Sequence, residues 1–159
     1  MIDSPTSTVA QLHNENSYQE GEADAALDPA TGAVAYKDAN GDWHVRQATE
    51  GEDTKRVVRE QRNPPRTSGS VGDGTAPIDD PYAAGDNVET VGFHRYDRAR
   101  LRVGVNASAD PTDAEVGWDT DGGITDQDAG AADPANIVGR GVELIERTDA
   151  DNLLVVEFF

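Results

Sequence analysis

Closely spaced carboxylates are the side chains of this sequence whose type and spacing could bind a metal ion. Asp119 and Asp121 are two positions apart, and residues 38–42 (Asp-Ala-Asn-Gly-Asp) repeat the spacing with which a calcium loop begins. A calcium loop beginning at residue 38 also requires a glycine and a closing glutamate, but Trp43 and Thr49 occupy those positions. Because the chain contains 20 Asp, such spacings also arise by chance, and turns favour Asp, Asn and Gly. We therefore predict turns at both segments and keep Asp119 and Asp121 as weak metal candidates.

Histidine could supply the base of a nucleophilic enzyme. The sequence has three, His13, His44 and His94, which we assign to an N-terminal arm, a hairpin and an arginine-rich segment. No G-x-S-x-G nucleophile motif accompanies them. We therefore predict a protein that is not an enzyme, with no catalytic residue and no cofactor.

The positively charged residues fall into two clusters, which together hold nine of the 13 basic side chains. The first comprises Lys55, Arg56, Arg59, Arg62 and Arg66, and the second comprises Arg95, Arg98, Arg100 and Arg102. One interpretation is that they face an acidic surface of a neighbouring protein, because arginine makes bidentate pairs with carboxylates. The other is that they pair with the chain's own Asp and Glu. The sequence leaves both interpretations open.

The overall charge is strongly negative. The 31 acidic and 13 basic residues give a net charge of −18 over 159 residues, with a pI near 4.2. Only two basic residues are Lys and eleven are Arg, a composition typical of proteins that work at molar salt, where the Debye length is about 3 Å. We therefore expect a high-salt host. The same charge repels phosphates, so a direct nucleic-acid partner is not expected.

The cellular context follows from what the sequence lacks. It has no cysteine, which excludes disulfides and thiolate metal sites. No apolar run approaches 18 residues, and the N-terminus carries no basic or apolar leader. We expect no membrane partner and synthesis in the host cytoplasm.

Alternating apolar residues and turn motifs predict an all-β protein. Asn40-Gly41 favours the positive φ angles of a tight turn between antiparallel strands over 33–37 and 43–47. Further strands are expected over 55–60 (which could also be one helical turn), 87–93, 99–105, 115–118, 136–146 and 153–159. The last of these is apolar on both faces, which favours a central position in a sheet.

The strand spacing predicts a small antiparallel β-barrel or sandwich. Residues 27–159 are expected to form this single domain, with a long loop at 67–80. Residues 1–26 are polar and lack stable periodicity, so they are predicted to form an extended N-terminal arm.

Several short segments recur in one family of proteins. They are residues 28–34 (Asp-Pro-Ala-Thr-Gly-Ala-Val), 82–88 (Tyr-Ala-Ala-Gly-Asp-Asn-Val), 137–143 (Ile-Val-Gly-Arg-Gly-Val-Glu) and 151–158 (Asp-Asn-Leu-Leu-Val-Val-Glu-Phe). In this order they resemble the head decoration, or cement, proteins of tailed double-stranded DNA viruses. Residues 60–66 and 92–101 are similar to structural proteins of haloarchaeal tailed viruses. The resemblance extends over residues 28–159.

The resemblance implies a virion protein on the outer surface of the capsid, standing as a homotrimer that bridges major capsid proteins. The arm would lie on a neighbouring subunit. The loop at 67–80 and the two arginine clusters depart from the pattern of the bacterial-virus members. The side chains expected at this protein interface are Ile2, Val9, Leu12, Tyr18, Arg56, Arg59, Arg62, Arg95 and Arg98. The alternatives are another virion β-protein, from the tail, turret or neck, and a free halophilic module that binds a metal or a glycan.

Overall fold

The computed structural model describes residues 7–13, 16–61, 76–127 and 136–159. Within these residues the fold is all-β, as predicted, and helical structure is confined to short 3-10 segments such as Pro77–Asp79. The strands are β1 (Val9–Gln11), β2 (Ser17–Ala23), β3 (Gly32–Lys37), β4 (Trp43–Gln47), β5 (Arg56–Val58), β6 (Asn87–Gly92), β7 (Arg98–Arg102), β8 (Glu115–Trp118), β9 (Ile124–Thr125), β10 (Gly139–Ile145) and β11 (Leu153–Phe158). The described part of the chain contains no helix of the length and apolarity that crossing a membrane requires.

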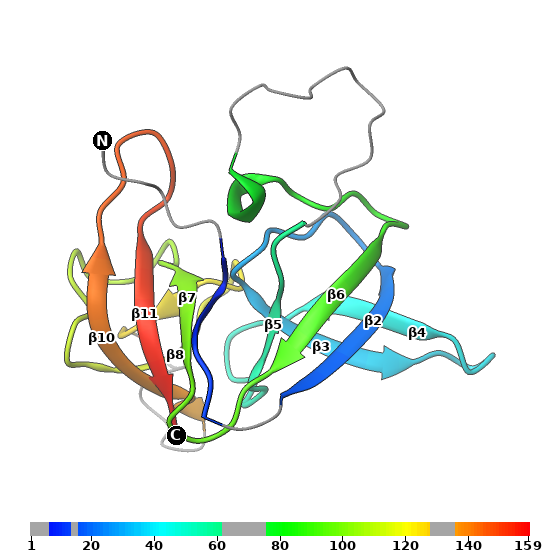
Figure 1. The fold of residues 1–159 in the computed structure, drawn as a ribbon, viewed down its shortest axis with the longest axis horizontal. Helices are drawn as coiled ribbons and strands as arrows, with labels where there is room; N and C mark the ends of the chain where they lie inside the picture. The colour runs from blue at the N-terminus through cyan, green and yellow to red at the C-terminus, as the bar shows by residue number, and fades with distance from the viewer. Residues whose placement is uncertain (1–6, 14–15, 62–75, 128–135) are drawn as a thin grey trace.

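Five strands close into a barrel in the order β2-β4-β3-β5-β6 (Figure 1). The β3–β4 hairpin is the one predicted from the sequence: Lys37 pairs with Trp43 across a turn in which Gly41 has a φ of 89°. Asp38 stabilises this turn by accepting a hydrogen bond from the N–H of Asp42 at 2.9 Å. The barrel is not antiparallel throughout, because β2 and β4 run parallel where they close it.

The remaining strands form a six-stranded sheet in the order β1-β7-β11-β10-β8-β9. β11 lies between β7 and β10, which confirms the central position predicted from its apolar residues. Leu153–Val156 are all buried, since the strand is covered on both faces.

A shared hydrophobic core joins the barrel to the sheet. The larger cluster brings Val57 and Val91 of the barrel together with Leu101, Trp118 and Phe158 of the sheet. A second cluster lies among the barrel strands and their loops: Ala23, Leu27, Ala33, Val45, Val58, Tyr82 and Val88. Because the larger core draws on both sheets, the described residues form one packed unit.

The structure describes residues 7–13 and 16–26 of the predicted extended N-terminal arm, and there the chain pairs with strands of its own fold. β1 pairs with β7, and β2 pairs with β6 along its length, from Ser17 opposite Gly92 to Glu22 opposite Asn87. Backbone hydrogen bonding to these strands explains how so polar a segment is ordered within its own chain. The prediction of one barrel over residues 27–159 is likewise too simple, because β7–β11 belong to the second sheet.

The long loop predicted at 67–80 is described only at its end. There Ile78 is buried in a small cluster with Ala30 and Leu153, which seats the 3-10 turn against the sheet. Residues 67–75 lie outside the described part of the chain.

Candidate interaction site

The chain passes from the barrel to the sheet through the β6–β7 turn, residues 93–97, which Asp97 organises. The Asp97 side chain is fully buried and accepts hydrogen bonds from the N–H groups of His94 and His13, each at 2.8 Å. The Asn16 amide donates a third, at 3.1 Å. Burial raises the pKa of Asp97, but these hydrogen bonds outweigh burial and hold the pKa below its ordinary value. One ionised carboxylate therefore ties this turn to the β1–β2 connection.

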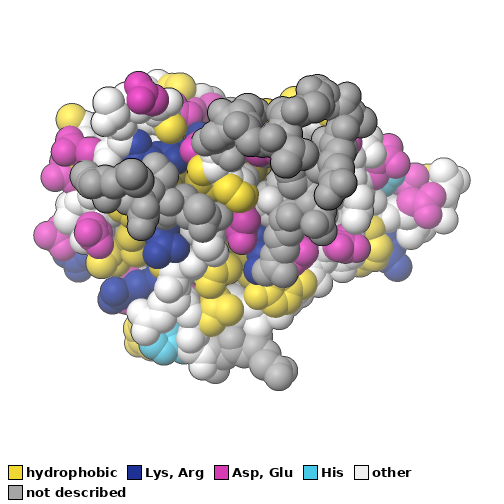
Figure 2. Space-filling model, turned by 45° about the horizontal axis from the view of Figure 1, so that its top comes forward, with side chains coloured by type: hydrophobic (Ala, Val, Ile, Leu, Met, Phe, Trp, Pro, Cys, Tyr) yellow, Lys and Arg dark blue, Asp and Glu magenta, His cyan; other side chains and the backbone are white. Residues whose placement is uncertain are grey.

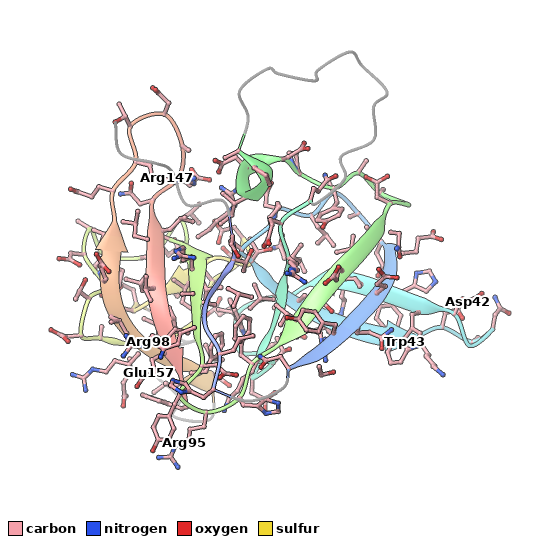
Figure 3. All side chains as sticks on the ribbon, in the orientation of Figure 1. Asp42, Trp43, Arg95, Arg98, Arg147 and Glu157 are labelled. Carbon is pink, nitrogen blue, oxygen red and sulfur yellow. The ribbon has the colours of Figure 1, made fainter. Side chains whose placement is uncertain are left out.

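Tyr96 stands at the tip of this turn in an unusual conformation. Its φ is 74°, in the left-handed region that a tyrosine rarely adopts, while its N–H donates to the carbonyl of Phe158 at 2.9 Å. The side chain is 55% exposed, and the Arg95 guanidinium lies 5.0 Å from its ring centroid. Arg95 projects from the lower end of the molecule (Figure 3). The turn thus presents an arginine and an aromatic ring to solvent on a strained backbone.

Basic and apolar side chains lie close to this turn in the described residues, together with Glu157, which pairs with Arg98 (Figure 3). Lys55 donates a hydrogen bond to the carbonyl of Phe159, and Phe159 and Leu12 are 42% and 37% exposed. In Figure 2 basic, histidine and hydrophobic side chains occupy the lower-left edge, and the acidic side chains in view lie mainly above and to the right of it. In a chain of net charge −18, this end is a local exception.

The other arginines predicted at an interface are largely paired within the chain. Arg56 donates to the Ser17 carbonyl at 3.2 Å, and Arg59, which is 9% exposed, pairs with Glu89 at 2.5 Å. Arg98 pairs with Glu157 of the neighbouring strand at 2.8 Å (Figure 3). For these three side chains the structure favours the internal-pairing interpretation. Arg62 and Ile2 lie outside the described residues.

The rest of the second arginine cluster is also engaged internally. Arg100 donates to the carbonyls of Ser7 and Val9, each at 3.0 Å. Arg102 is buried, and it pairs with Asp79 at 3.2 Å and with Asp151 at 3.0 Å. Arg147, which lies outside both clusters and which the sequence analysis did not single out, pairs with the same Asp79 at 2.9 Å. These contacts fasten the 3-10 turn to the sheet.

The apolar residues predicted at the interface lie in three different settings. Val9 is partly buried against the larger core. Leu12 is exposed beside the β6–β7 turn, as described above. Tyr18 is 46% exposed on β2, and the Arg59 guanidinium lies 5.1 Å from its ring centroid. The structure brings Leu12 and Arg95 to one end of the molecule, because the His13 N–H and the β6–β7 turn share Asp97.

The weak metal candidates form backbone contacts. Asp119 is 2% exposed and accepts hydrogen bonds from the N–H of Asn106 at 2.7 Å and of Thr120 at 2.6 Å. Burial raises the pKa of Asp119, but the hydrogen bonds prevail and hold it below the ordinary value. Asp121 accepts the Gly123 N–H at 3.0 Å, as expected of a turn residue. No group of three or more potential ligands among His, Cys, Asp and Glu is placed to hold a metal ion in the described residues.

Of the three histidines, His44 has the most elaborate surroundings. Its Nδ1 lies 3.0 Å from Asp24 and its Nε2 lies 3.6 Å from Asp38, while its ring stacks on Tyr36 at 5.7 Å. The hydrogen bond to Asp24 is the main cause that raises the pKa of His44 above its ordinary value. These contacts join the β3–β4 hairpin to Asp24, which follows β2.

Two features that distinguish the β6–β7 turn, the conformation of Tyr96 and the role of Asp97, were not predicted from the sequence, whereas Arg95 was. The only available signal was the position of His-Arg-Tyr-Asp between two predicted strands, because positive φ is not a preference of tyrosine.

The fold is similar to that of a viral protein, the N base of head fiber gp8.5 in bacteriophage phi29. The two structures have a TM-score of 0.55 at 12% sequence identity, and the match covers 91% of this chain and 95% of the other. No protein-family model and no curated protein matches the chain. At this level of identity the similarity establishes a shared fold across nearly the whole of both chains.

Proposed function

We propose that this chain is a non-enzymatic structural protein of a virion, located on the outer surface of the capsid. The observation that carries the proposal is the match to a phage head fiber base over 91% of this chain and 95% of that one. The resemblance of residues 28–159 to head decoration proteins is independent support, because it rests on short sequence segments. The acidic, lysine-poor composition supports a high-salt host, and the tailed virus is what the resemblance implies.

The proposed mechanism is mechanical. A packed body of barrel and sheet spans adjacent major capsid proteins and resists their separation, which requires no covalent chemistry. Three copies joined as a homotrimer would multiply weak contacts through effective concentration, so that each copy needs only a small contact area. The internal pairing of most arginines supports a rigid body, since it fastens strands and turns that lie far apart in the sequence.

Analysis of virus particles purified from cells that produce this chain tests the proposal. We expect mass spectrometry to find the chain in fixed proportion to the major capsid protein. An antibody against the chain should label the shells of intact particles. Labelling confined to the tail or neck would favour the other virion role, and absence of the chain from particles would contradict both.

A further inference from the structure

We propose that the β6–β7 turn, with Arg95 and Tyr96 at its tip, is the docking point of this protein on a carboxylate-rich surface of the capsid shell. This inference rests on the proposed function and identifies where the shell is bound and by what chemistry. It assigns binding to one turn, where the sequence pointed to two whole arginine clusters.

The conformation of Tyr96 is the first argument. Left-handed backbone is unfavourable for a residue with a bulky side chain, and such strain persists where the surrounding structure enforces it. Here the Phe158 carbonyl fixes the Tyr96 N–H at 2.9 Å, and Asp97 fixes the preceding turn. The strained backbone does not bury the ring, because Tyr96 is 55% exposed. Contact between the exposed Tyr96 ring and a partner would offset the energetic cost of this conformation.

Arg95 differs from the other arginines of the two clusters that the structure describes. Arg56, Arg59, Arg98, Arg100 and Arg102 all donate to carboxylates, hydroxyls or carbonyls of their own chain. Within the described residues, no carboxylate lies within ion-pair distance of Arg95, whose guanidinium stacks on Tyr96 instead. A guanidinium has five N–H donors, and a carboxylate accepts two of them at once, which is the contact we infer for Arg95 on the shell.

The third argument concerns rigidity and composition. The ionised Asp97 joins the turn to the β1–β2 connection, so Arg95 and Tyr96 are held ready before binding and lose little freedom on contact. Leu12 and Phe159 are exposed next in sequence to His13 and Phe158, which are hydrogen-bonded to this turn, and their apolar side chains can exclude water around a charged pair. Arginine and tyrosine surrounded by apolar side chains are the composition that dominates binding energy at protein interfaces.

Charge selects the partner. The net charge of −18 repels a nucleic acid, whereas a basic turn on an acidic body suits an acidic protein surface that meets this end alone. A shell protein that works in the same high salt would carry such a surface. A bidentate arginine–carboxylate pair beside apolar contacts keeps its geometry at salt concentrations that screen long-range attraction.

Co-sedimentation with capsid shells tests the inference. The shells come from a virus whose gene for this chain has been deleted, and the labelled protein is added at molar salt as wild type, Arg95→Glu, Tyr96→Ala or Tyr96→Gly. We expect Arg95→Glu and both Tyr96 variants to weaken binding by about tenfold or more. Added polyglutamate should compete with the wild type, and double-stranded DNA should not.

Two comparisons separate binding from folding. Lys37→Glu makes the same charge reversal on the β3–β4 hairpin, whose tip lies at the far end of the molecule (Figure 3), and should leave shell binding within about twofold of wild type. Tyr96→Gly should melt at a higher temperature than Tyr96→Ala, because glycine relieves the positive φ, yet it should bind as weakly. A stable variant that fails to bind is the signature of a docking side chain.

The outcomes are distinguishable. Failure of the wild type to bind shells would contradict the proposed function itself. Binding of the wild type with no loss in Arg95→Glu or the Tyr96 variants would overturn the docking inference alone. The inference would also be overturned if Arg95→Glu abolished self-association in sedimentation velocity, or if DNA competed and polyglutamate did not.

Discussion

Two buried or partly buried carboxylates show how single residues organise this protein. Asp97 collects N–H donors from two connections that are far apart in the sequence, and Asp79 receives two arginines, Arg102 and Arg147. Each of these two carboxylates links connecting segments that lie outside the strands of the barrel and sheet. Most of the described arginines therefore fasten segments of their own chain, and the docking inference rests on Arg95, which has no ion pair among the described residues.

At this scale we predict that Asp97→Asn destabilises the protein. The carboxylate of Asp97 accepts hydrogen bonds through both oxygens, whereas the amide of asparagine has one acceptor oxygen and no charge to strengthen the bonds. The free energy of unfolding should therefore fall by about 2 kcal/mol. Chemical denaturation at pH 7 measures it. Asp149→Asn, at an exposed position, is the matched control and should change the free energy by less than about 0.5 kcal/mol.

The same residue gives a pH dependence. The pKa of Asp97 is lower in the folded protein than its ordinary value, so its contribution to stability is present above the ordinary Asp pKa and is lost as pH falls through the folded pKa. Wild type should therefore lose more stability on acidification than Asp97→Asn does. Parallel curves for the two proteins would contradict the assigned hydrogen bonds.

A second residue-scale prediction concerns the β3–β4 hairpin. The Asp24 hydrogen bond raises the pKa of His44, so the charged form of His44 persists to higher pH in the folded chain than in the unfolded one. Its contribution to stability is complete below the unfolded pKa and disappears as pH rises through the folded pKa. Titration of His44 by NMR should show a raised pKa that Asp24→Asn lowers. Asp42→Asn, in the same hairpin, should change it less, and equal shifts in both variants would contradict the account.

At the scale of elements, the contact between barrel and sheet depends on the absence of a side chain at Gly32. A Cβ there would lie 2.6 Å from Cδ2 of Trp118 and 2.8 Å from Cβ of Ala48. Trp118 is itself fixed by its indole N–H, which donates to the Thr54 carbonyl at 2.8 Å. The indole ring of Trp118, which belongs to the sheet, can therefore pack against the barrel backbone only because β3 begins with glycine.

We predict that Gly32→Ala lowers the free energy of unfolding by about 1–3 kcal/mol, although alanine normally suits a strand better than glycine does. Thermal or denaturant unfolding measures the change. Gly92→Ala is the control in β6, where the nearest atom is the flexible guanidinium of Arg56 at 3.1 Å, and its effect should be smaller. A stabilising Gly32→Ala would contradict the packing described here.

Elements with strong local signals could be predicted from the sequence. The Asn40-Gly41 turn specified the β3–β4 hairpin, and the apolar run Leu153–Val156 specified a central strand. β2 was missed because Ser17–Ala23 has polar residues on both faces, and only Gly21 and Ala23 of the seven are buried. Its strand conformation comes from pairing with β6, more than 60 residues away in the sequence, and local periodicity carries no trace of such a partner.

The candidate site was predictable to a similar degree. Clustering of arginines along the chain pointed to Arg95, but which arginines remain unpaired depends on acids brought from distant strands, such as Glu89 for Arg59 and Glu157 for Arg98. The exposure of Tyr96 on a left-handed backbone likewise follows from the Asp97 contacts and has no local sequence signal.

At the scale of the whole molecule, the net charge sets the conditions under which the protein is stable. Eighteen excess negative charges repel one another, and about 1 M salt shortens the Debye length to about 3 Å, against about 10 Å at 0.1 M. We predict that the melting temperature of the isolated protein falls when salt is lowered from molar concentration to 0.1 M. Differential scanning calorimetry measures it. The larger hydrophobic cluster draws on both barrel and sheet, which predicts one cooperative transition at each salt concentration. An unchanged melting temperature would contradict the proposed high-salt origin.

The central claim is that this body of barrel and sheet is attached to the outside of a capsid. An image reconstruction by cryo-electron microscopy of particles from producing cells tests it most directly. The account predicts density that fits this fold on the outer face of the shell, with the β6–β7 turn directed at the major capsid protein. Particles whose shells carry no such density would contradict it.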